Sequence, residues 1–171
     1  ALPICALTSV LALIASLGTA SAAETDITIG MQLEPPHLDP TSAAAGAIDN
    51  VVYSNIFEGL TRFMGDGSVV PGLAKSWDIS DDGLRYTFHL RGDVQFHDGT
   101  AMDAADVKFS LDRARAEDST NAQKALFAGI ADVAVIDPLT VALTLEAPNG
   151  NLLFNLAWGD AVIVAPETIE R

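Results

Sequence analysis

Residues 84–115, LRYTFHLRGDVQFHDGTAMDAADVKFSLDRAR, combine the pattern of a strand with that of a capped helix. Apolar and polar residues alternate over the first eight positions, as they do in a strand with one buried face. The turn-forming run Ser80-Asp81-Asp82-Gly83 precedes this strand and predicts a hairpin with residues 77–79. We expect the buried face of the strand to carry Leu84, Tyr86, Phe88 and Leu90.

The second half of this stretch predicts a helix over residues 104–115. An Asp-Gly turn at residues 98–99 precedes it. Asp103, followed three residues later by Asp106, is typical of a helix start, because a carboxylate can accept hydrogen bonds from the free amides of the first turn. Phe109 lies nearly opposite the apolar face, so we expect the helix to pack on two sides. The apolar face comprises Val107, Ser110, Leu111 and Ala114.

Further elements are predicted before this stretch. Residues 26–31 alternate as in a strand, with Ile27, Ile29 and Met31 on one face. Prolines at positions 35, 36 and 40 predict a rigid loop over residues 32–40. An amphipathic helix is then predicted by apolar residues at helical spacing, with Asp49 in its first turn. These residues are Ile48, Val51, Val52, Ile56 and Leu60.

The chain after residue 115 continues with short elements. Residues 116–123 are polar and predict an exposed loop. Residues 133–136 and 141–145 flank Asp137-Pro138-Leu139-Thr140, which predicts a second hairpin. A short helix within residues 152–158 and an extended stretch over residues 161–165 are expected to follow.

The first 23 residues have the composition of a signal peptide. Residues 1–18 carry no charge, residues 7–17 form an apolar block, and small residues follow at 20–22, as at a cleavage site. The basic residues that normally precede such a block are missing, so we expect the natural N-terminus to lie further upstream. A transmembrane anchor is the alternative, but a span needs ~20 apolar residues, and polar residues interrupt this run.

Composition excludes several other classes of function. The single cysteine, Cys5, lies in the predicted signal peptide, so the remaining chain has no disulfide and no thiol nucleophile. The formal net charge is −14, and every acidic residue lies at or after Glu24. Such a charge repels nucleic acids and anionic membrane surfaces, so we expect neither as a partner.

Catalytic and metal-binding patterns are weak. Asp78-x-Ser80-x-Asp82-Gly83 imitates the start of a calcium loop, but His89 stands where a bidentate carboxylate is needed. His89, His97 and Asp98 match no zinc-ligand spacing. The sequence contains neither a G-x-S-x-G nucleophile motif nor a phosphate-binding glycine loop. We therefore expect no enzyme activity, no metal and no cofactor.

Several segments together resemble the family 5 extracellular solute-binding proteins, the peptide-binding components of ABC importers. The resemblance rests on the hairpin and helix of residues 84–115 and on three earlier segments in the same order. These are LEPPHLDP (33–40), VVYSNIFEGLTRF (51–63) and GLAKSWDISDDG (72–83). The set covers most of the chain and is specific, whereas each segment alone is a weak signal.

The resemblance implies an α/β fold of the periplasmic binding protein type II kind, incomplete because family members are much longer. Residues 24–45 would supply the first strand and loop of the main lobe, and residues 46–171 most of a small inserted α+β domain. The implied protein is a periplasmic monomer that captures a peptide-like solute and delivers it to ABC permease subunits, with no nucleic acid involved. By weak analogy, the ligand contacts expected here are Gln32, Leu33, Glu34, Pro35, Trp158 and Gly159.

Two alternatives stay open from the sequence. A truncated fragment without binding activity of its own is one, because much of the family's pocket comes from later parts of the chain. A secreted hydrolase is the other, because catalytic groups brought together from distant positions leave no local motif. Ligand identity stays open as well, since peptides, nickel chelates, glutathione, opines and some sugars are bound within the family.

Overall fold

The computed structural model describes residues 26–42, 46–53 and 55–169, so the predicted signal peptide lies outside the described residues. The chain divides into two units, residues 1–32 and residues 33–171. Within the described ranges, no helix is long and apolar enough to cross a membrane.

The described residues of the first unit correct one prediction. Residues 26–32 have irregular backbone and belong to no strand ladder among the described residues. Ile27 is 84% exposed and Ile29 is 73% exposed. The predicted strand over residues 26–31 is therefore wrong for this structure. A strand is held by hydrogen bonds to a neighbour, and an apolar face alone does not supply one.

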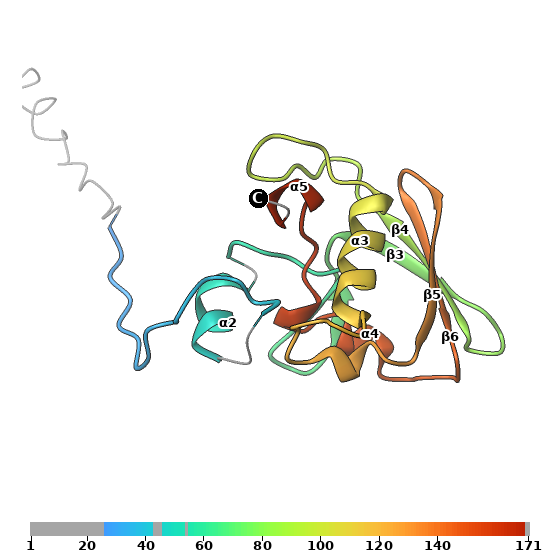
Figure 1. Ribbon diagram of the computed structural model, residues 1–171, viewed down its shortest axis with the longest axis horizontal. Coiled ribbons are helices and arrows are strands. Elements are labelled where there is room, and N and C mark those ends of the chain that lie inside the picture. The colour runs from blue at the N-terminus through green and yellow to red at the C-terminus, as the bar shows by residue number, and fades with distance from the viewer. Residues whose placement is uncertain (1–25, 43–45, 54, 170–171) are drawn as a thin grey trace, which may run out of the picture. The chain divides into compact units, whose positions relative to one another are not determined.

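A four-stranded antiparallel sheet forms the centre of the second unit (Figure 1). Its strand order is β3-β4-β6-β5, so β4 and β6 are the inner strands. The strands are β3 (Ala74–Ile79), β4 (Arg85–Leu90), β5 (Ile130–Asp137) and β6 (Thr140–Leu145). On β4, the alternation is confirmed by three buried side chains, whereas Leu84 precedes the strand and is half-buried.

Both predicted hairpins are confirmed. Between β3 and β4, the backbone N–H of Ser80 donates to the carbonyl of Arg85 over 2.9 Å, and Gly83 adopts a φ of 69°. This left-handed conformation costs little only for glycine, which explains the residue at the turn. Between β5 and β6, the Asp137 carboxylate accepts a hydrogen bond from the backbone N–H of Leu139 over 2.8 Å. A side chain that bonds its own backbone two residues on favours a turn.

The predicted helix is confirmed as α3 (Ala104–Arg115). The Asp103 carboxylate accepts from the N–H of Ala105 over 2.7 Å, and the Asp106 carboxylate accepts from the N–H of Asp103 over 2.8 Å. This reciprocal capping box satisfies amides that the helix itself leaves free. The predicted buried face of α3 is also confirmed, and Phe109 is half-buried.

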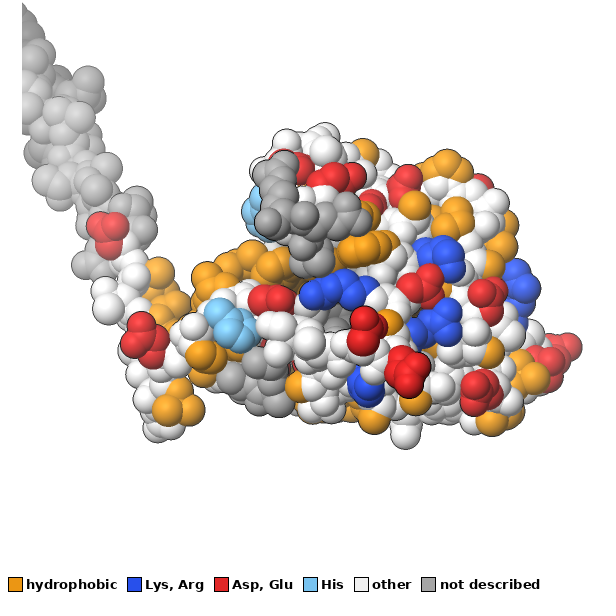
Figure 2. Space-filling view, viewed as in Figure 1, with side chains coloured by type: hydrophobic (Ala, Val, Ile, Leu, Met, Phe, Trp, Pro, Cys, Tyr) orange, Lys and Arg blue, Asp and Glu red, His pale blue; other side chains and the backbone are white. Residues whose placement is uncertain are grey.

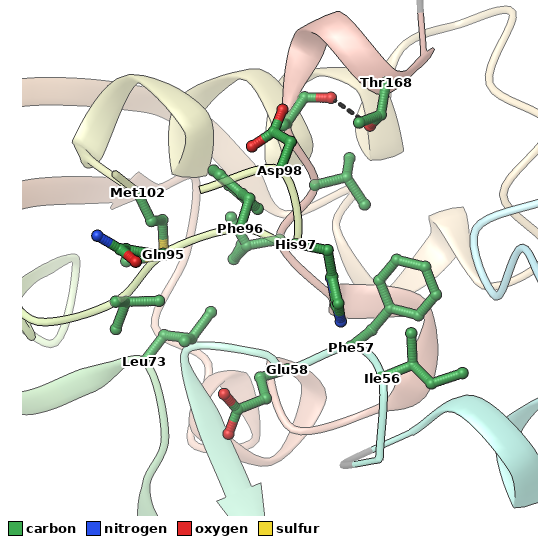
Figure 3. A pocket seen from close by; sticks show the side chains of 14 residues that line it. Ile56, Phe57, Glu58, Leu73, Gln95, Phe96, His97, Asp98, Met102 and Thr168 are labelled. Carbon is green, nitrogen blue, oxygen red and sulfur yellow. Dashed lines mark hydrogen bonds between the residues drawn. The ribbon is translucent and has the colours of Figure 1, made fainter. Parts of the chain in front are cut away.

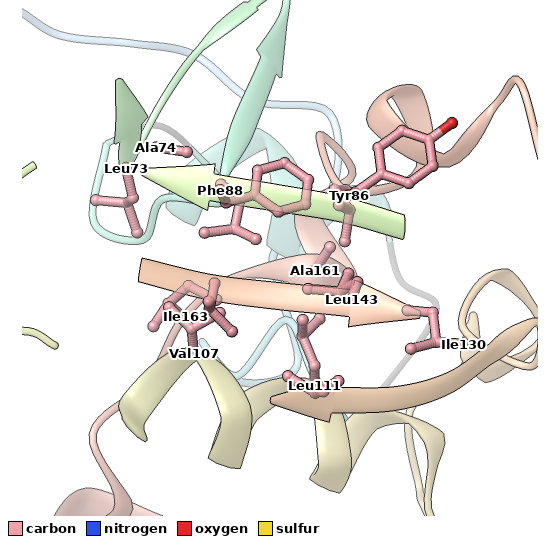
Figure 4. Packing of buried hydrophobic residues seen from close by; sticks show 14 of the residues in the cluster. Leu73, Ala74, Tyr86, Phe88, Val107, Leu111, Ile130, Leu143, Ala161 and Ile163 are labelled. Carbon is pink, nitrogen blue, oxygen red and sulfur yellow. The ribbon is translucent and has the colours of Figure 1, made fainter. Parts of the chain in front are cut away.

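The hydrophobic core lies between α3 and the sheet (Figure 4). Val107 and Leu111 of α3 point toward Leu143 of β6 and toward Ile163, and Phe88 of β4 is fully buried in the same cluster. Trp77 is partly buried against this core and its ring centroid lies 6.3 Å from that of Phe88, as expected of a packing residue. Burying such side chains is the main favourable contribution to folding.

The outer side of α3 is polar. Lys108 and Arg115 both form ion pairs with Asp112, at 2.7 Å and 2.8 Å. Lys108 also donates to the carbonyl of Val133, and Arg115 to that of Ile130, so the two side chains tie α3 to β5. Basic and acidic side chains accordingly alternate over α3 and β5 on the face shown in Figure 2.

The helix predicted over residues 48–60 is shorter than expected. The observed helix, α2, covers Gly46–Val52. Beyond it the backbone is held by other segments, because the carbonyl of Glu58 accepts from the N–H of Ile163 and that of Gly59 accepts from the N–H of Leu73. Tertiary hydrogen bonds thus override the helical spacing of the apolar residues. The chain then forms a small hairpin of β1 (Thr61–Phe63) and β2 (Val69–Pro71).

The remaining elements are short. The 3-10 helix η1 covers Lys124–Leu126, α4 covers Leu152–Asn155, a second 3-10 helix η2 covers Gly159–Ala161, and α5 covers Pro166–Ile169. Between η2 and α5, residues 162–165 are extended and buried, which confirms most of the predicted apolar stretch.

Candidate functional site

Trp158, one of the expected ligand contacts, belongs to a group of neighbouring aromatic rings. Its ring centroid lies 6.1 Å from that of Phe154, in an edge-to-face arrangement, and 6.3 Å from that of Phe63. The ring of Phe63 in turn lies 6.0 Å from that of Tyr53. We call these four residues the aromatic cluster. Such ring geometries are attractive beyond the burial of area.

The cluster is both anchored and accessible. The Tyr53 hydroxyl donates to the carbonyl of Ala157, which fixes the ring against the segment that carries Trp158. At the same time, Phe63 and Phe154 are each 39% exposed and Trp158 is 37% exposed. An exposed group of rigid aromatic side chains is a surface on which an apolar or planar group of a ligand can pack.

Three segments of the chain position these rings. Phe154 lies on α4 and Trp158 follows one turn later, Phe63 ends β1, and Tyr53 follows α2. The segments are joined because the Thr61 hydroxyl donates to the carbonyl of Leu153 over 2.7 Å. The cluster therefore depends on tertiary contacts between residues 53–63 and residues 153–158.

Gly159, the second expected contact beside Trp158, is buried and lies against a carboxylate. A side chain at this position would collide with the carboxylate of Asp49. A larger side chain at this position would therefore require the Asp49 side chain to move. Its role as a ligand contact stays a prediction.

Two acidic residues, Asp49 of α2 and Asp160 of η2, lie next to Gly159. Asp160 is only 5% exposed. Burial, and secondly the charge of the nearby Asp49, raise the pKa of Asp160 to about 6. Burial also raises the pKa of Asp49 above its usual value. Charged carboxylates are disfavoured where water is excluded and like charges are close. This pair was not anticipated from the sequence.

The other expected contacts lie on the proline-containing loop. Gln32 belongs to the first unit, and Leu33 begins the second. Leu33 is 70% exposed, Glu34 is exposed and Pro35 is half-buried. Among the described residues, no hydrogen bond, ion pair or ring contact joins Leu33, Glu34 or Pro35 to the aromatic cluster. The loop's role in ligand binding stays a prediction.

The histidines and the acidic turn have ordinary structural surroundings. His89 Nε2 lies 2.8 Å from Asp78 Oδ2, across the hairpin on the solvent side. In the turn, Asp82 accepts hydrogen bonds from the Ser80 hydroxyl and from the backbone N–H of Leu84, and these lower the pKa of its carboxyl. Within the described ranges, no group of three or more His, Cys, Asp or Glu residues is arranged to hold a metal ion.

Sequence reasoning missed three members of the aromatic cluster, Tyr53, Phe63 and Phe154. One signal was present, because Phe154 and Trp158 are four residues apart in a predicted helix and therefore fall on one face. Tyr53 and Phe63 join them only through tertiary contacts, which no local pattern indicates.

With this geometry established, comparison with known proteins gives a consistent result. Residues 68–168 match the family described as bacterial extracellular solute-binding proteins, family 5 Middle. The chain is 39% identical over 134 residues to the glutathione-binding protein GsiB of Pectobacterium atrosepticum, covering 78% of this chain and 26% of that protein. It is 34% identical over 165 residues to GsiB of Salmonella paratyphi A, covering 92% of this chain and 32% of that protein.

Solved structures give the same fold. The binding protein AgaA from A. tumefaciens R10, in complex with agropinic acid, superimposes with a TM-score of 0.75 at 34% identity, over 80% of this chain and 28% of that chain. NikZ from Campylobacter jejuni, in complex with Ni(L-His), gives a TM-score of 0.71 at 33% identity, over 81% of this chain and 27% of that chain.

These matches confirm the resemblance and the fold class derived from the sequence. The chain spans about a quarter to a third of the length of the curated relatives it matches. Its mixed α/β architecture corresponds to part of a family 5 periplasmic binding protein. The chain belongs to the family 5 bacterial extracellular solute-binding proteins.

Proposed function

We propose that this chain is part of the periplasmic substrate-binding component of an ABC importer, which captures a small peptide-like solute and delivers it to the membrane permease. The single observation that carries the proposal is the 39% identity to a glutathione-binding protein over 134 residues. In this function the protein binds and releases its solute unchanged, as a monomer and without a cofactor.

The names of the relatives support one class of ligand. By name, their ligands include glutathione, the complex Ni(L-His) and, for the periplasmic binding protein DppA of Helicobacter pylori, the peptide STSA. Glutathione and STSA are short peptides, and histidine is an amino acid. A peptide or amino-acid derivative is therefore the class of solute that we propose for this protein.

We further propose that two stretches contact this solute. Gln32, Leu33 and Glu34 are exposed and Pro35 is half-buried. Together they form a proline-stiffened loop, which can present backbone groups without a large loss of conformational entropy. Trp158 and Gly159 form the other stretch, where the aromatic cluster offers an apolar surface. The domain division that accompanies this proposal is residues 24–45 in the main lobe and residues 46–171 in the inserted domain, after a signal peptide at residues 1–23.

Titration calorimetry on the protein as its gene encodes it tests this function. Reduced glutathione, the peptide STSA, Ni(L-His) and agropinic acid are titrated separately, and we expect saturable binding of at least one. The 171-residue chain is titrated in parallel, because binding by the longer product alone would identify this chain as a fragment without activity of its own. Failure of all four to bind the full product would contradict the proposal.

A variant connects binding to the proposed site. Trp158→Ala removes the largest exposed ring of the aromatic cluster, and we expect ligand affinity to fall about fivefold, since one aromatic contact contributes roughly 1 kcal/mol. Leu139→Ala is the matched control, because Leu139 is also 37% exposed but lies in the β5–β6 turn. If the protein turned over any of these ligands, and His97→Ala or Asp98→Asn abolished that turnover, the result would instead indicate a hydrolase.

A further inference from the structure

The proline-containing loop is held to the rest of the second unit at one end. Among residues 33–41, only Pro40 and Thr41 are buried, whereas Leu33 is 70% exposed and Leu38 is 51% exposed. The contacts that hold residues 40–41 in place therefore also determine where the exposed part of the loop lies.

A chain of hydrogen bonds joins this buried end to α3. Nη1 of Arg113 donates to Oγ1 of Thr41 over 2.7 Å, although the two residues are 72 positions apart in the sequence. The same hydroxyl donates to Oδ1 of Asp39 over 2.7 Å, and the backbone N–H of Thr41 donates to that oxygen over 2.8 Å. Because a guanidinium can only donate, the hydroxyl has to accept from it and gives its own proton to the carboxylate. The direction of each bond in the chain is thus fixed.

The charges at the two ends of this chain reinforce it. Burial alone would raise the pKa of Asp39, but hydrogen bonds from Thr41 and Ser42 and the charge of Arg113 lower it below its usual value. The carboxyl is therefore ionised at neutral pH, and the Thr41 hydroxyl bridges a cation and an anion. Hydrogen bonds in such a chain polarise one another, which strengthens each of them.

Prolines extend the effect of this anchor along the loop. Pro35, Pro36 and Pro40 each have a fixed φ, and each restricts the residue before it to extended conformations. The backbone between Leu33 and Thr41 therefore has few free rotations. Fixing one end of such a segment limits the positions that the other end can take, so Arg113 can affect residues that it does not touch.

We propose that Arg113 is a positioning residue for solute binding, which holds the proline-containing loop against the last turn of α3 through Thr41 and Asp39. This role rests on the proposed function, in which residues 32–35 contact the solute. A loop that is already anchored loses less conformational entropy when a solute binds, so its affinity is higher than that of a free loop.

Hydrogen exchange measured by mass spectrometry tests the anchor without any ligand, on the protein as its gene encodes it. Arg113→Met keeps an unbranched side chain but removes the charge and the donors. We expect the amides of residues 37–41 to exchange about three- to tenfold faster in this variant, the range for loss of one partly exposed hydrogen bond.

The loop before α3, residues 94–102, is the internal control. Part of it lines a pocket of about 380 Å³ (Figure 3). This loop is held by its own hydrogen bonds, because the N–H of Phe96 donates to the carbonyl of Thr100 and that of Met102 to the carbonyl of Val94, at 2.9 Å and 3.1 Å. Its exchange should therefore be the same in the variant and in the unaltered protein.

Further variants separate the hydrogen-bond chain from a general loss of charge or stability. Thr41→Val removes the hydroxyl and should have the same effect as Arg113→Met, and the two changes together should add little to either alone. Thr41→Ser keeps the hydroxyl and should exchange nearly as slowly as the unaltered protein. Arg85→Met, at an exposed position of β4, is the matched control for loss of an arginine. If Arg113→Met does not fold, the comparison of Thr41→Val with Thr41→Ser still decides.

Calorimetry with reduced glutathione, the peptide STSA, Ni(L-His) and agropinic acid connects the anchor to binding. For a probe that binds the unaltered protein, we expect Arg113→Met to weaken the affinity about three- to tenfold and Arg85→Met to leave it unchanged. Unchanged exchange of residues 37–41 in a folded Arg113→Met variant would overturn the proposed role, and so would full affinity in a variant whose loop exchanges faster. Failure of all four probes to bind the unaltered protein would contradict the proposed function and this role together, a pattern that differs from the other two.

Discussion

Asp160 is a buried carboxylate whose environment favours its protonated form. The pKa of Asp160, about 6, lies above the value near 3.9 expected in the unfolded chain. Between these values the folded state binds more protons than the unfolded state, so this group's contribution to stability is present at low pH and is lost as pH rises from about 4 to about 6. The residue therefore makes the fold less stable at neutral pH than it would be with an uncharged side chain.

This leads to a prediction for Asp160→Asn. We expect the free energy of unfolding at pH 7 to increase by about 1–3 kcal/mol, because the variant has no buried charge to accommodate. At pH 4 the difference should disappear, since the wild-type carboxyl is then mostly protonated. Urea denaturation at several pH values measures this difference. Asp132→Asn, at an exposed position of β5, should show no such pH-dependent gain.

Gly59 tests a different effect at the scale of one residue, the close approach of two backbones. A Cβ atom placed on Gly59 would lie 2.7 Å from the backbone oxygen of Leu156, which cannot rotate away as a side chain could. We predict that Gly59→Ala lowers the free energy of unfolding by about 1–3 kcal/mol, as overpacking typically does. Gly65→Ala is the control because a Cβ there meets nothing within 4 Å. If the two variants were equally stable, the backbone at Leu156 would have to shift enough to make room for the added Cβ atom.

At the scale of elements, α3 shows how a local sequence signal determines structure. Asp103 and Asp106 bond one another's backbone amides, and the helix begins at the next residue after Asp103. We predict that Asp103→Ala destabilises the protein by about 1 kcal/mol, within the usual range for loss of an N-cap. Thermal or urea unfolding measures the effect. Asp103→Asn should restore most of the stability, because Asn also caps well.

A control separates capping from charge. Asp81→Ala removes an exposed carboxylate from the β3–β4 turn, and its loss should change stability by less than about 0.5 kcal/mol. If Asp103→Ala cost no more than Asp81→Ala, the capping box would contribute nothing beyond surface charge. If Asp103→Asn failed to restore stability, the negative charge at the helix start would be the important property, rather than the hydrogen bonds.

The elements also show what sequence could and could not predict. α3 and both hairpins of the sheet were predicted because each depends on neighbouring residues, such as the cap at Asp103 and the turn glycine at position 83. The strand at residues 26–31 and the long helix after Ile48 were wrong. In both cases the backbone conformation depended on hydrogen-bond partners that are distant in the sequence. Glu58 and Gly59 have such partners, whereas residues 26–31 have none among the described residues.

The same limit applies to the candidate site. Trp158 was selected through the family resemblance, and the pair Phe154 and Trp158 could have been found from helical spacing. Tyr53 and Phe63 come from segments about a hundred residues away in sequence, and Asp49 meets the segment of Asp160 in the same way. Groups assembled by tertiary packing carry no periodicity, and only the folded structure reveals them. Whether Gln32 to Pro35 contact the solute stays a prediction.

At the scale of the whole molecule, the core lies within one part of the chain. Every member of the core cluster falls between Leu60 and Ile163, although α3, the sheet and the last short helices all contribute to it. Among the described residues, this cluster therefore takes its members from residues 60–163 of the second unit.

This arrangement predicts the effect of two deletions. A chain that begins at Leu33 should keep the unfolding midpoint within about 3 °C, a shift that corresponds to about 1 kcal/mol for a domain of this size, because no member of the core cluster is removed. A chain that ends at Gly150 should lose cooperative unfolding, since it lacks the buried residues Leu152, Leu156 and Ile163. Differential scanning calorimetry distinguishes the two outcomes. A cooperative transition in the second chain would mean that α3 and the four-stranded sheet hold a core without the segment that carries Phe154 and Trp158.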